Sequence, residues 1–399
     1  MYTLYGDGIH DDTEAIQEML DSGICEVALP VPKAFYCISK TLRVHSGQTL
    51  RLPETAMVQL LPSSSCPMLT NAERPAHDIV IKGGIWDYNN VNQAPNPIKV
   101  MLAEARNTHM NGDPDYVATY ESTGPLGVCM SFDHVDRFTI RDLTVKNPVT
   151  FSMRMAYMTH FTVENIRFDQ NLGNPTAENM DGIHIDGGCR FGLIHNVQGT
   201  CYDDIVAINA DDGYDGPISD IVVDGVFGES SLRGVRLLST KSEIKNVTVS
   251  NVFGTFYQNC VVLAYFFPHI GTRGRMSHIT LRSIHGSNAP RRPEYCKGDN
   301  SYYFFSFIWV DDDIDIDHLV VDGLYRDEPI GSVETFKICK GARIRTLSLS
   351  NVLHQNRVGK PLPLLLNEGE IERLYMYNVD AGEDTILENR GTIGKITKI

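Results

Sequence analysis

Three aspartates have the residue type and spacing that acid–base chemistry needs. Asp181 begins the short apolar segment 181–185, and the pair Asp203 and Asp204 stands at the start of a second segment, 204–208. One carboxylic acid can protonate a leaving oxygen while other carboxylates activate water, which is what hydrolysis of a glycosidic bond requires. The alternative is that these are ordinary turn aspartates, which are common where strands end.

The two segments alternate as β-strands do. Every second residue is apolar and on one side in 183–185 and in 206–208, which is the period of a strand. When these apolar sides are aligned, Asp204 falls over Asp181 and Asp203 lies beside them. Because neighbouring strands lie about 4.8 Å apart, residues at equivalent positions of consecutive turns can share one site.

The elements that would position the aspartates come from an internal repeat. Short phrases with alternating apolar residues recur from Phe138 to the C-terminus, and an Asn or Asp suited to a tight corner often precedes the last apolar residue. One apolar residue per phrase, here called the anchor, aligns the repeat: Leu143, Ile166, Val197, Val226, Val252, Ile284, Leu324, Val352 and Val379. Successive anchors are mostly 23 to 32 residues apart, with one interval of 40. Repeats too small to bury their own apolar face become stable by stacking into a solenoid.

The alternation within each phrase selects the kind of solenoid. Helical repeats would show apolar residues at i, i+3 and i+4, and these phrases do not. The sequence therefore predicts an all-β fold, a right-handed, single-stranded parallel β-helix of about ten coils in one domain, 1–399. One helix is expected near the start, from Asp12 to Leu20, with capping residues and an apolar stripe. Within an N-terminal capping segment, 1–30, it should cover the open end of the β-helix.

Composition limits the partners. With 35 basic and 50 acidic residues, nucleic acid and anionic membranes are not expected as partners. The chain has no leader-like segment and no apolar run long enough to span a bilayer, so a cytoplasmic location is expected unless a leader was trimmed. Nine scattered cysteines without a CxxC pair indicate buried thiols. No cofactor or metal motif is present, and the acidic run 311–317 is interpreted as a solvated turn rather than a calcium loop. A homo-oligomer is left open.

Two irregular segments interrupt the repeat. The inserted loop region 86–128 carries Trp86, Tyr88 and Tyr116, and the segment 290–299 carries three basic residues. Long loops in a repeat protein are often functional. The aromatic rings could form walls for sugar rings, and the alternative is that they pack into the barrel.

Several of these motifs resemble a known family. The opening phrase 7–17, with Asp7-Gly8 and Asp11-Asp12-Thr13, is similar to that of many β-helix carbohydrate enzymes, as is the phrase 83–87. The motif Asn179-x-Asp181-Gly182 followed by Asp203-Asp204 resembles the polygalacturonase family, glycoside hydrolase family 28. The resemblance implies an inverting hydrolysis in which Asp203 is the general acid and Asp181 and Asp204 position the attacking water.

The chain also departs from that family. Arg233 stands where the resemblance implies a histidine, and 263–265 (Leu-Ala-Tyr) stands where it implies the Arg-Ile-Lys that binds the sugar carboxylate. Strand alternation would put Arg236 on the same face as His184 and Leu263, where it could bind an anionic group one coil earlier. For Arg233 and Arg236 the alternative is an ion pair with the aspartates and no ligand contact. The residues expected to contact substrate are Asn179, His184, Arg233, Arg236, Tyr265 and Trp86.

Three classes of function follow. The first is a glycosidase acting on an oligosaccharide or polysaccharide of pectin type or a related type, though not standard polygalacturonate. The second is a polysaccharide lyase or epimerase on the same scaffold, using a basic residue to abstract a proton. The third is a non-catalytic glycan-binding or assembly module, which would not need the three aspartates.

Overall fold

A computed structural model describes residues 3–95, 127–170, 173–174, 177, 179–268, 270–271, 273–290 and 305–398. These residues form two compact units. Unit 1 comprises 1–185 and 189–203, and unit 2 comprises 186–188 and 204–399. The single domain expected over 1–399 stays a prediction. Most of the inserted region 86–128, with Tyr116, and the basic residues after Pro290 lie outside the described residues.

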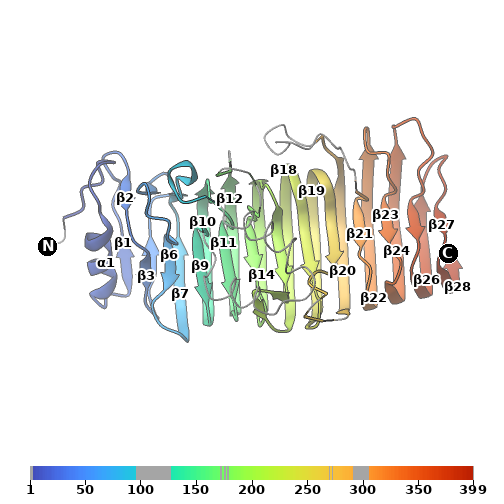
Figure 1. Ribbon diagram of the computed structural model, residues 1–399, viewed down its shortest axis with the longest axis horizontal. Coiled ribbons are helices and arrows are strands. Elements are labelled where there is room, and N and C mark those ends of the chain that lie inside the picture. The colour runs from blue at the N-terminus through green and yellow to red at the C-terminus, as the bar shows by residue number, and fades with distance from the viewer. Residues whose placement is uncertain are drawn as a thin grey trace. The chain divides into compact units, whose positions relative to one another are not determined.

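Unit 1 is built of parallel strands that follow one another in three ladders. One ladder runs β1–β4–β7–β10–β12–β14, a second runs β2–β5–β8 and on to the end of β10, and a third runs β3–β6–β9–β11–β13. The elements are α1 (Thr13–Asp21), β1 (Glu26–Ala28), β2 (Tyr36–Ile38), β3 (Leu42–Val44), β4 (Thr49–Arg51), β5 (Met57–Leu60), β6 (Leu69–Asn71), β7 (Ala76–Lys82), β8 (Ile85–Asp87), η1 (Asn90–Asn92), β9 (Met130–Asp133), β10 (Val135–Lys146), β11 (Met153–Ala156), β12 (Thr159–Asp169), β13 (Ile183–Ile185) and β14 (Arg190–Thr200). Three short strands per turn, each paired with its equivalents on neighbouring turns, make a parallel β-helix (Figure 1).

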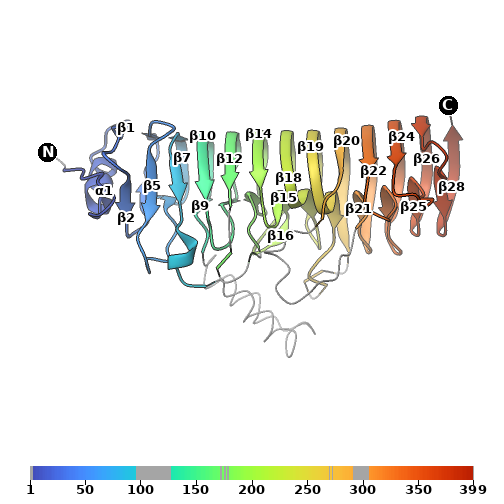
Figure 2. The same cartoon turned by 90° about the horizontal axis from the view of Figure 1, so that it is seen from above.

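Unit 2 continues the same pattern with longer strands. One ladder runs β18–β19–β20–β22–β24–β26–β28, and a second joins β15 to the ends of β18 and β19 and then to β21, β23, β25 and β27. The elements are β15 (Asp204–Asn209), β16 (Asp211–Asp212), β17 (Tyr214–Asp215), β18 (Ile218–Leu238), β19 (Glu243–Ala264), β20 (Gly274–Asn288), β21 (Ile308–Val310), β22 (Ile314–Glu328), β23 (Phe336–Ile338), β24 (Arg343–Asn356), β25 (Leu365–Asn367), β26 (Glu370–Asp380), β27 (Leu387–Asn389) and β28 (Thr392–Lys398). Figure 2 shows β18, β19, β20, β22 and β24 side by side. The predicted fold class is confirmed.

The anchors of the repeat are in register within each unit. In unit 1, Leu143 pairs with Ile166 and Ile166 with Val197. In unit 2 the pairing runs without a slip through all six remaining anchors, from Val226 to Val379. The anchors are buried except the last, Val379, which is half-buried, so each of the other coils adds an apolar side chain to the same column of the core.

Polar side chains hold the corners that precede the anchors. Asn165, Asn196, Asn251 and Asn351 all have a positive φ, between 52° and 56°, a backbone region that asparagine tolerates and β-branched residues do not. Their side-chain amides donate to the coil before, as Asn351 does to Asp322 Oδ1 at 2.9 Å. The predicted role of Asn and Asp at these corners is confirmed.

Helix α1 closes the first coil of unit 1. Its residues Ile16 and Leu20 are buried, and the side-chain amide of Gln17 accepts from Arg43 N–H at 2.8 Å and donates to Arg43 C=O at 3.2 Å. An open sheet edge exposes unpaired backbone groups, which is a hazard. The Gln17 amide pairs both backbone groups of Arg43 on the edge strand β3. The predicted N-cap differs in detail, because the buried carboxylate of Asp12 accepts from Tyr5 N–H instead.

Among the described residues, none of the helical segments has the length and apolar content that a membrane crossing needs.

The corner at Asn351 gives a test of the fold. Asn351→Val should lower the free energy of unfolding by about 1–3 kcal/mol, since a β-branched residue is strained at this positive φ. Asn351→Gly keeps the conformation and removes only the side-chain hydrogen bonds to its neighbouring coils, so it should cost less. Thermal unfolding followed by circular dichroism compares the two variants. Equal stability of the valine and glycine variants would show that the corner does not impose this conformation.

Candidate active site

Asp181 is placed by parallel pairing between β11 and β13 in unit 1. Met153 and Met155 pair with Ile183 and Ile185, and Ser152 N–H donates to the carbonyl oxygen of Asp181 at 2.8 Å. The Asp181 side chain is buried. Asn179, two residues earlier, is half-buried with a φ of 52°, so a left-handed turn delivers the chain to the strand.

His184 orients the carboxylate of Asp181. Its Nδ1 lies 2.6 Å from Asp181 Oδ2, and its ring stacks on Phe151 with centroids 3.9 Å apart. His184 has no exposed surface, so the sequence-based role in substrate contact is corrected. Alternation on a three-residue strand put His184 outward, but stacking and the bond to Asp181 fill its surroundings. It acts on the site through Asp181.

Asp203 lies close to Asp181. Both belong to unit 1, and a carboxylate oxygen of each lies within 4.8 Å of the other. Asp203 is half-buried and Asp181 is buried. Two carboxylates this close repel each other when both are charged. A proton donor and a charged acceptor side by side are what acid–base catalysis needs.

Gln170 ties the chain segments of both aspartates together. Its Nε2 donates to Ser152 Oγ at 3.0 Å and to the Asp181 carbonyl oxygen at 3.4 Å, and its Oε1 accepts from Tyr202 N–H at 3.1 Å. Gln170 is 4% exposed, and Tyr202 directly precedes Asp203. One buried amide therefore sets the spacing of the pair from the backbone, a role that the sequence analysis missed because Gln170 lies in no motif.

Asp204 belongs to unit 2, where two arginines hold it. In the pairing of β15 with β18, Asp204 stands opposite Arg233 and Ala207 opposite Arg236. Arg233 Nη1 lies 3.3 Å from Asp204 Oδ1, and Arg236 Nε lies 2.9 Å from Oδ2. The ion-pair alternative for the two arginines is thus the one present. The predicted alignment of Asp204 over Asp181 stays a prediction.

The position of Arg236 differs by one residue from the sequence-based alignment. Arg236 pairs with Val262, whereas Leu263 pairs with Leu237 in the core. Arg236 and Leu263 therefore face opposite sides of the sheet. The guanidinium carbon of Arg236 lies 5.8 Å from the ring centroid of Phe266, and its Nη2 lies 3.7 Å from Asp212.

Two aromatic residues expected to contact substrate have other partners. Trp86 is fully buried, and its indole N–H donates to Gly83 C=O at 3.1 Å, so it packs in the core and forms no sugar wall. Tyr265 is half-buried; its hydroxyl donates to Gly271 C=O at 2.8 Å, and burial raises its pKa. Alternation gives little guidance here, because Trp86 lies on the three-residue strand β8 and Tyr265 directly follows the end of β19. Cys189, Cys201 and Cys260 are buried, as predicted.

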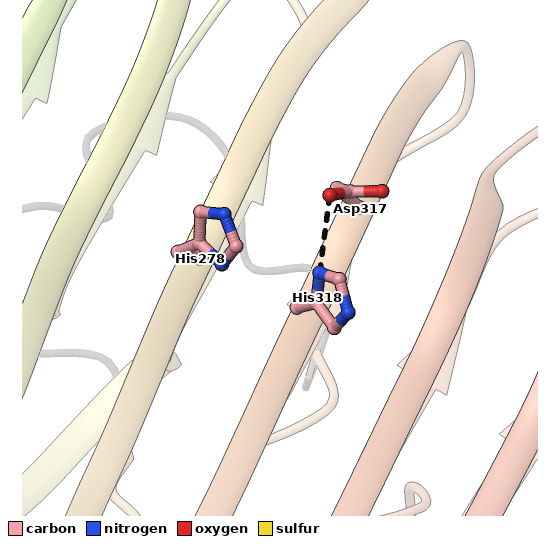
Figure 3. A group of neighbouring side chains, drawn as sticks. All are labelled: His278, Asp317 and His318. Carbon is pink, nitrogen blue, oxygen red and sulfur yellow. Dashed lines mark hydrogen bonds and ion pairs between the residues drawn. The ribbon is translucent and has the colours of Figure 1, made fainter.

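A separate group of polar side chains lies on unit 2. His278, Asp317 and His318 offer ligand atoms within 4.8 Å of one another, and the two imidazoles stack with centroids 5.1 Å apart (Figure 3). Both oxygens of Asp317 are held by Arg345, at 2.5 and 2.8 Å. A cation bound here would have to displace that guanidinium, which makes the group a poor metal site.

Sequence reasoning missed an outward-facing aromatic residue of unit 2, Trp309. It lies on β21 between inward-facing Ile308 and Val310, and the cation of Lys337 lies 5.1 Å from its ring centroid. The alternation of Ile308-Trp309-Val310 and Phe336-Lys337-Ile338 was the available signal. β21 falls within the longest interval of the repeat and β23 within the next one, and neither strand belongs to an aligned phrase.

Comparison with known proteins bears on the fold. No protein-family model matches the chain, and no curated protein matches it. Solved structures do. The endo-xylogalacturonan hydrolase of Aspergillus tubingensis is similar over 98% of this chain and 98% of its own, at 14% identity and a TM-score of 0.58. The A-module of the Azotobacter vinelandii mannuronan C-5 epimerase is similar over 100% of this chain and 98% of its own, at 13% identity and a TM-score of 0.62.

A third similar structure is an adhesin. The surface adhesin PfbA of Streptococcus pneumoniae is similar over 97% of this chain and 90% of its own, at 15% identity and a TM-score of 0.57. Hydrolases, an epimerase and an adhesin thus share this β-helix, and the expected structural resemblance to polygalacturonases and other pectin-lyase-like proteins is confirmed. At these identities the likeness establishes the fold, and function has to be argued from the site.

Gln170 gives a test of the site. Gln170→Leu keeps the volume and removes three hydrogen bonds, so the spacing of Asp181 and Asp203 should relax and kcat should fall by roughly 10- to 100-fold. KM should stay nearly constant, because no substrate contact is lost. Gln170→Glu keeps the acceptor for Tyr202 N–H and should recover part of the rate. Kinetics on any oligosaccharide that the wild type cleaves, with circular dichroism for folding, measure this; unchanged kcat in folded Gln170→Leu would contradict it.

Proposed function

We propose that the protein is a glycoside hydrolase that cleaves an O-glycosidic bond in a pectin-type or related oligosaccharide or polysaccharide. The observation that carries the proposal is the close pair Asp181 and Asp203, with Asp181 fixed by His184. The fold alone would not favour a hydrolase over the other proteins that share it.

The roles of the pair follow from their surroundings. His184 Nδ1 lies 2.6 Å from Asp181 Oδ2, and in the proposal it carries a proton that it donates to a charged Asp181. Asp203, half-buried and thus more open to a substrate, then carries the proton. In the proposed step Asp203 gives that proton to the glycosidic oxygen as the C–O bond breaks. Water adds to the anomeric carbon and loses its proton to Asp181, assisted by Asp204, the residue that follows Asp203 in the chain.

The spacing bears on stereochemistry. Inverting enzymes usually separate their two carboxyl groups by about 6.5–9.5 Å, leaving room for a water between them. The nearest oxygens of Asp181 and Asp203 lie within 4.8 Å, so a water cannot stand on the line between them and has to enter beside the pair. The short spacing is closer to that of retaining enzymes, about 5–5.5 Å, so inversion is proposed on the family resemblance alone, and NMR of the first-formed anomer measures it.

The alternatives are weaker for stated reasons. A lyase or epimerase needs a basic residue that removes a proton from the carbon next to the sugar carboxylate. The basic candidates already have partners: Arg233 and Arg236 pair with Asp204, and His184 is buried against Asp181. A non-catalytic glycan binder would have no use for a close pair of carboxylates, one buried and one half-buried. A glycan partner itself agrees with the similar structures, which include a xylogalacturonan hydrolase and a mannuronan epimerase.

The role of Asp203 gives the main test. On a panel of pectic and other oligosaccharides, the wild type should release new reducing ends without an unsaturated, ultraviolet-absorbing product. Asp203→Asn should lower kcat by about 100- to 10,000-fold, the usual contribution of an acid catalyst. Asp220→Asn is the matched control, since Asp220 is a corner residue with a φ of 60° where asparagine fits equally well. Near-normal turnover by Asp203→Asn would refute the assignment, and an unsaturated product would identify a lyase.

Specificity gives a second test. The residues at the end of β19 are Leu263, Ala264 and then Tyr265, which offer no cation to a sugar carboxylate. The protein should therefore act poorly on polygalacturonate, with kcat/KM at least about 10-fold below that on its best substrate, the effect of losing one charged hydrogen bond. Reducing-end assays on both substrates compare them. Robust hydrolysis of polygalacturonate would show that the carboxylate is bound in another way.

A further inference from the structure

One outward column of unit 2 crosses four strands in register. Arg236 pairs with Val262, Val262 with Trp309, and Trp309 with Lys337. These four residues are here called the Trp309 column. Since neighbouring parallel strands lie about 4.8 Å apart, the column places two cations at its ends and an apolar stretch between them.

The surroundings of the column are unusually apolar for the outside of a solenoid. Val262 packs with Leu238 and Ala264, which are buried although they stand on the outward face of their strands, and Phe267 and Trp309 pack against this cluster. Phe266, beside Arg236, remains 38% exposed. Among these side chains Phe266 is exposed and Trp309 is half-buried, and an exposed apolar surface on an exterior face is one mark of a binding site.

Trp309 is held in one orientation. Its indole N–H donates to Asp311 Oδ1 at 3.3 Å, and the edge of Phe305 meets its ring at a centroid distance of 5.8 Å. Asp311 also accepts from Tyr265 N–H at 3.2 Å, and burial raises the pKa of Asp311 to about 6. A half-buried aromatic ring whose orientation is fixed by a half-buried acceptor loses little entropy when a flat ligand packs on its open part.

Lys337 supplies a charge beside the ring. Its ammonium lies 3.3 Å from Glu368 as well as 5.1 Å from the Trp309 centroid, and both side chains are partly exposed, at 21% and 27%. An exposed ion pair contributes little stability. A ligand carboxylate can therefore take the place of Glu368 without a large cost, and Lys337 can swing toward it.

We propose that the Trp309 column is a glycan subsite that binds a carboxylated oligosaccharide, with a pyranose ring packed on Trp309 and a sugar carboxylate paired with Lys337. The inference rests on the proposed function, in that a glycan is taken as the ligand. The inference goes beyond the proposed function because it places the contact with the sugar carboxylate at Lys337 rather than in the segment 263–265. Sugar rings offer an apolar face and a polar rim, which matches an aromatic platform bordered by charged groups.

The two tryptophans make the experiment direct. The chain has only Trp86 and Trp309, and Trp86 is sealed in the core of unit 1. Titrating the full-length protein with uronic-acid oligosaccharides of three to six units should change the tryptophan emission. The change should persist in Trp86→Phe and vanish in Trp309→Phe. A signal lost with Trp86 and kept without Trp309 would overturn the proposal.

Charge and ring contacts are separated by a second comparison. Lys337→Gln should weaken binding of the uronate oligosaccharide by about 10-fold, the scale of one charge-assisted contact. It should leave binding of the same oligosaccharide with its carboxyl groups reduced to alcohols unchanged. Trp309→Ala should weaken binding of both ligands by at least that factor, measured by calorimetry. Equal binding by all three proteins, or no binding of either ligand by the wild type, would overturn the proposal.

The outcome is distinguishable from failure of the proposed function. If Asp203→Asn abolishes cleavage while Trp309→Ala and Lys337→Gln leave KM unchanged on long substrates, the hydrolase stands and the subsite falls. If uronate oligosaccharides bind through Trp309 and Lys337 but no glycan is cleaved, the subsite stands alone. Sedimentation of wild type and Trp309→Ala tests a second copy of the chain as occupant, and a dimer that dissociates in the variant would replace the glycan with self-association.

Discussion

The register of the parallel ladders is the constraint on which the rest of the structure depends. A slip of one residue would turn every side chain of a coil from the core to the outside, so the anchors and the corner asparagines have to agree from coil to coil. They do so in each unit: anchors pair with anchors, as Leu324 does with Val352, and corner amides donate to the preceding coil. Because equivalent positions recur about every 4.8 Å, the fold turns a linear repeat into columns of side chains, and a functional group is placed by its coil and its position within the coil.

Several buried polar groups are hydrogen-bonded to neighbouring coils, which helps polar residues to lie within a packed solenoid. Asp211 Oδ2 accepts three backbone N–H groups, from Thr240, Lys241 and Ser242, at 2.8 to 2.9 Å. Arg326 and Glu328 are fully buried on β22 and both bond to Asn288 at the end of β20: Arg326 Nη2 donates to its Oδ1 at 2.6 Å, and its backbone N–H donates to Glu328 at 2.9 Å. The buried amide of Gln170 likewise bonds to several chain segments, among them the Asp181 carbonyl and Tyr202 N–H. A buried acid costs little when its partners are fixed in advance, and the catalytic proposal uses that property.

Much of the fold could be predicted from the sequence, because the repeat leaves a periodic record. Alternation around anchors such as Val226 and Val252 gave the strands and their register, and the acidic pairs gave the candidate residues. What alternation could not give is what each polar side chain touches. The pattern placed His184 and Trp86 on the outside, yet both side chains are buried. His184 packs on Phe151 and contacts Asp181, and the indole N–H of Trp86 donates to the Gly83 carbonyl. Trp309 escaped notice because its strand has three residues and falls within the longest interval of the repeat.

The central claim is that Asp203 delivers a proton to the glycosidic oxygen beside a charged Asp181. It is tested most directly by a crystal structure of the Asp203→Asn protein with an oligosaccharide that the wild type cleaves. The account predicts that the side chain at position 203 lies within hydrogen-bond distance, about 2.6–3.2 Å, of the oxygen of the scissile bond, with the sugar on the same side as Asp181. A sugar bound with that oxygen far from position 203, and another acid in its place, would contradict it.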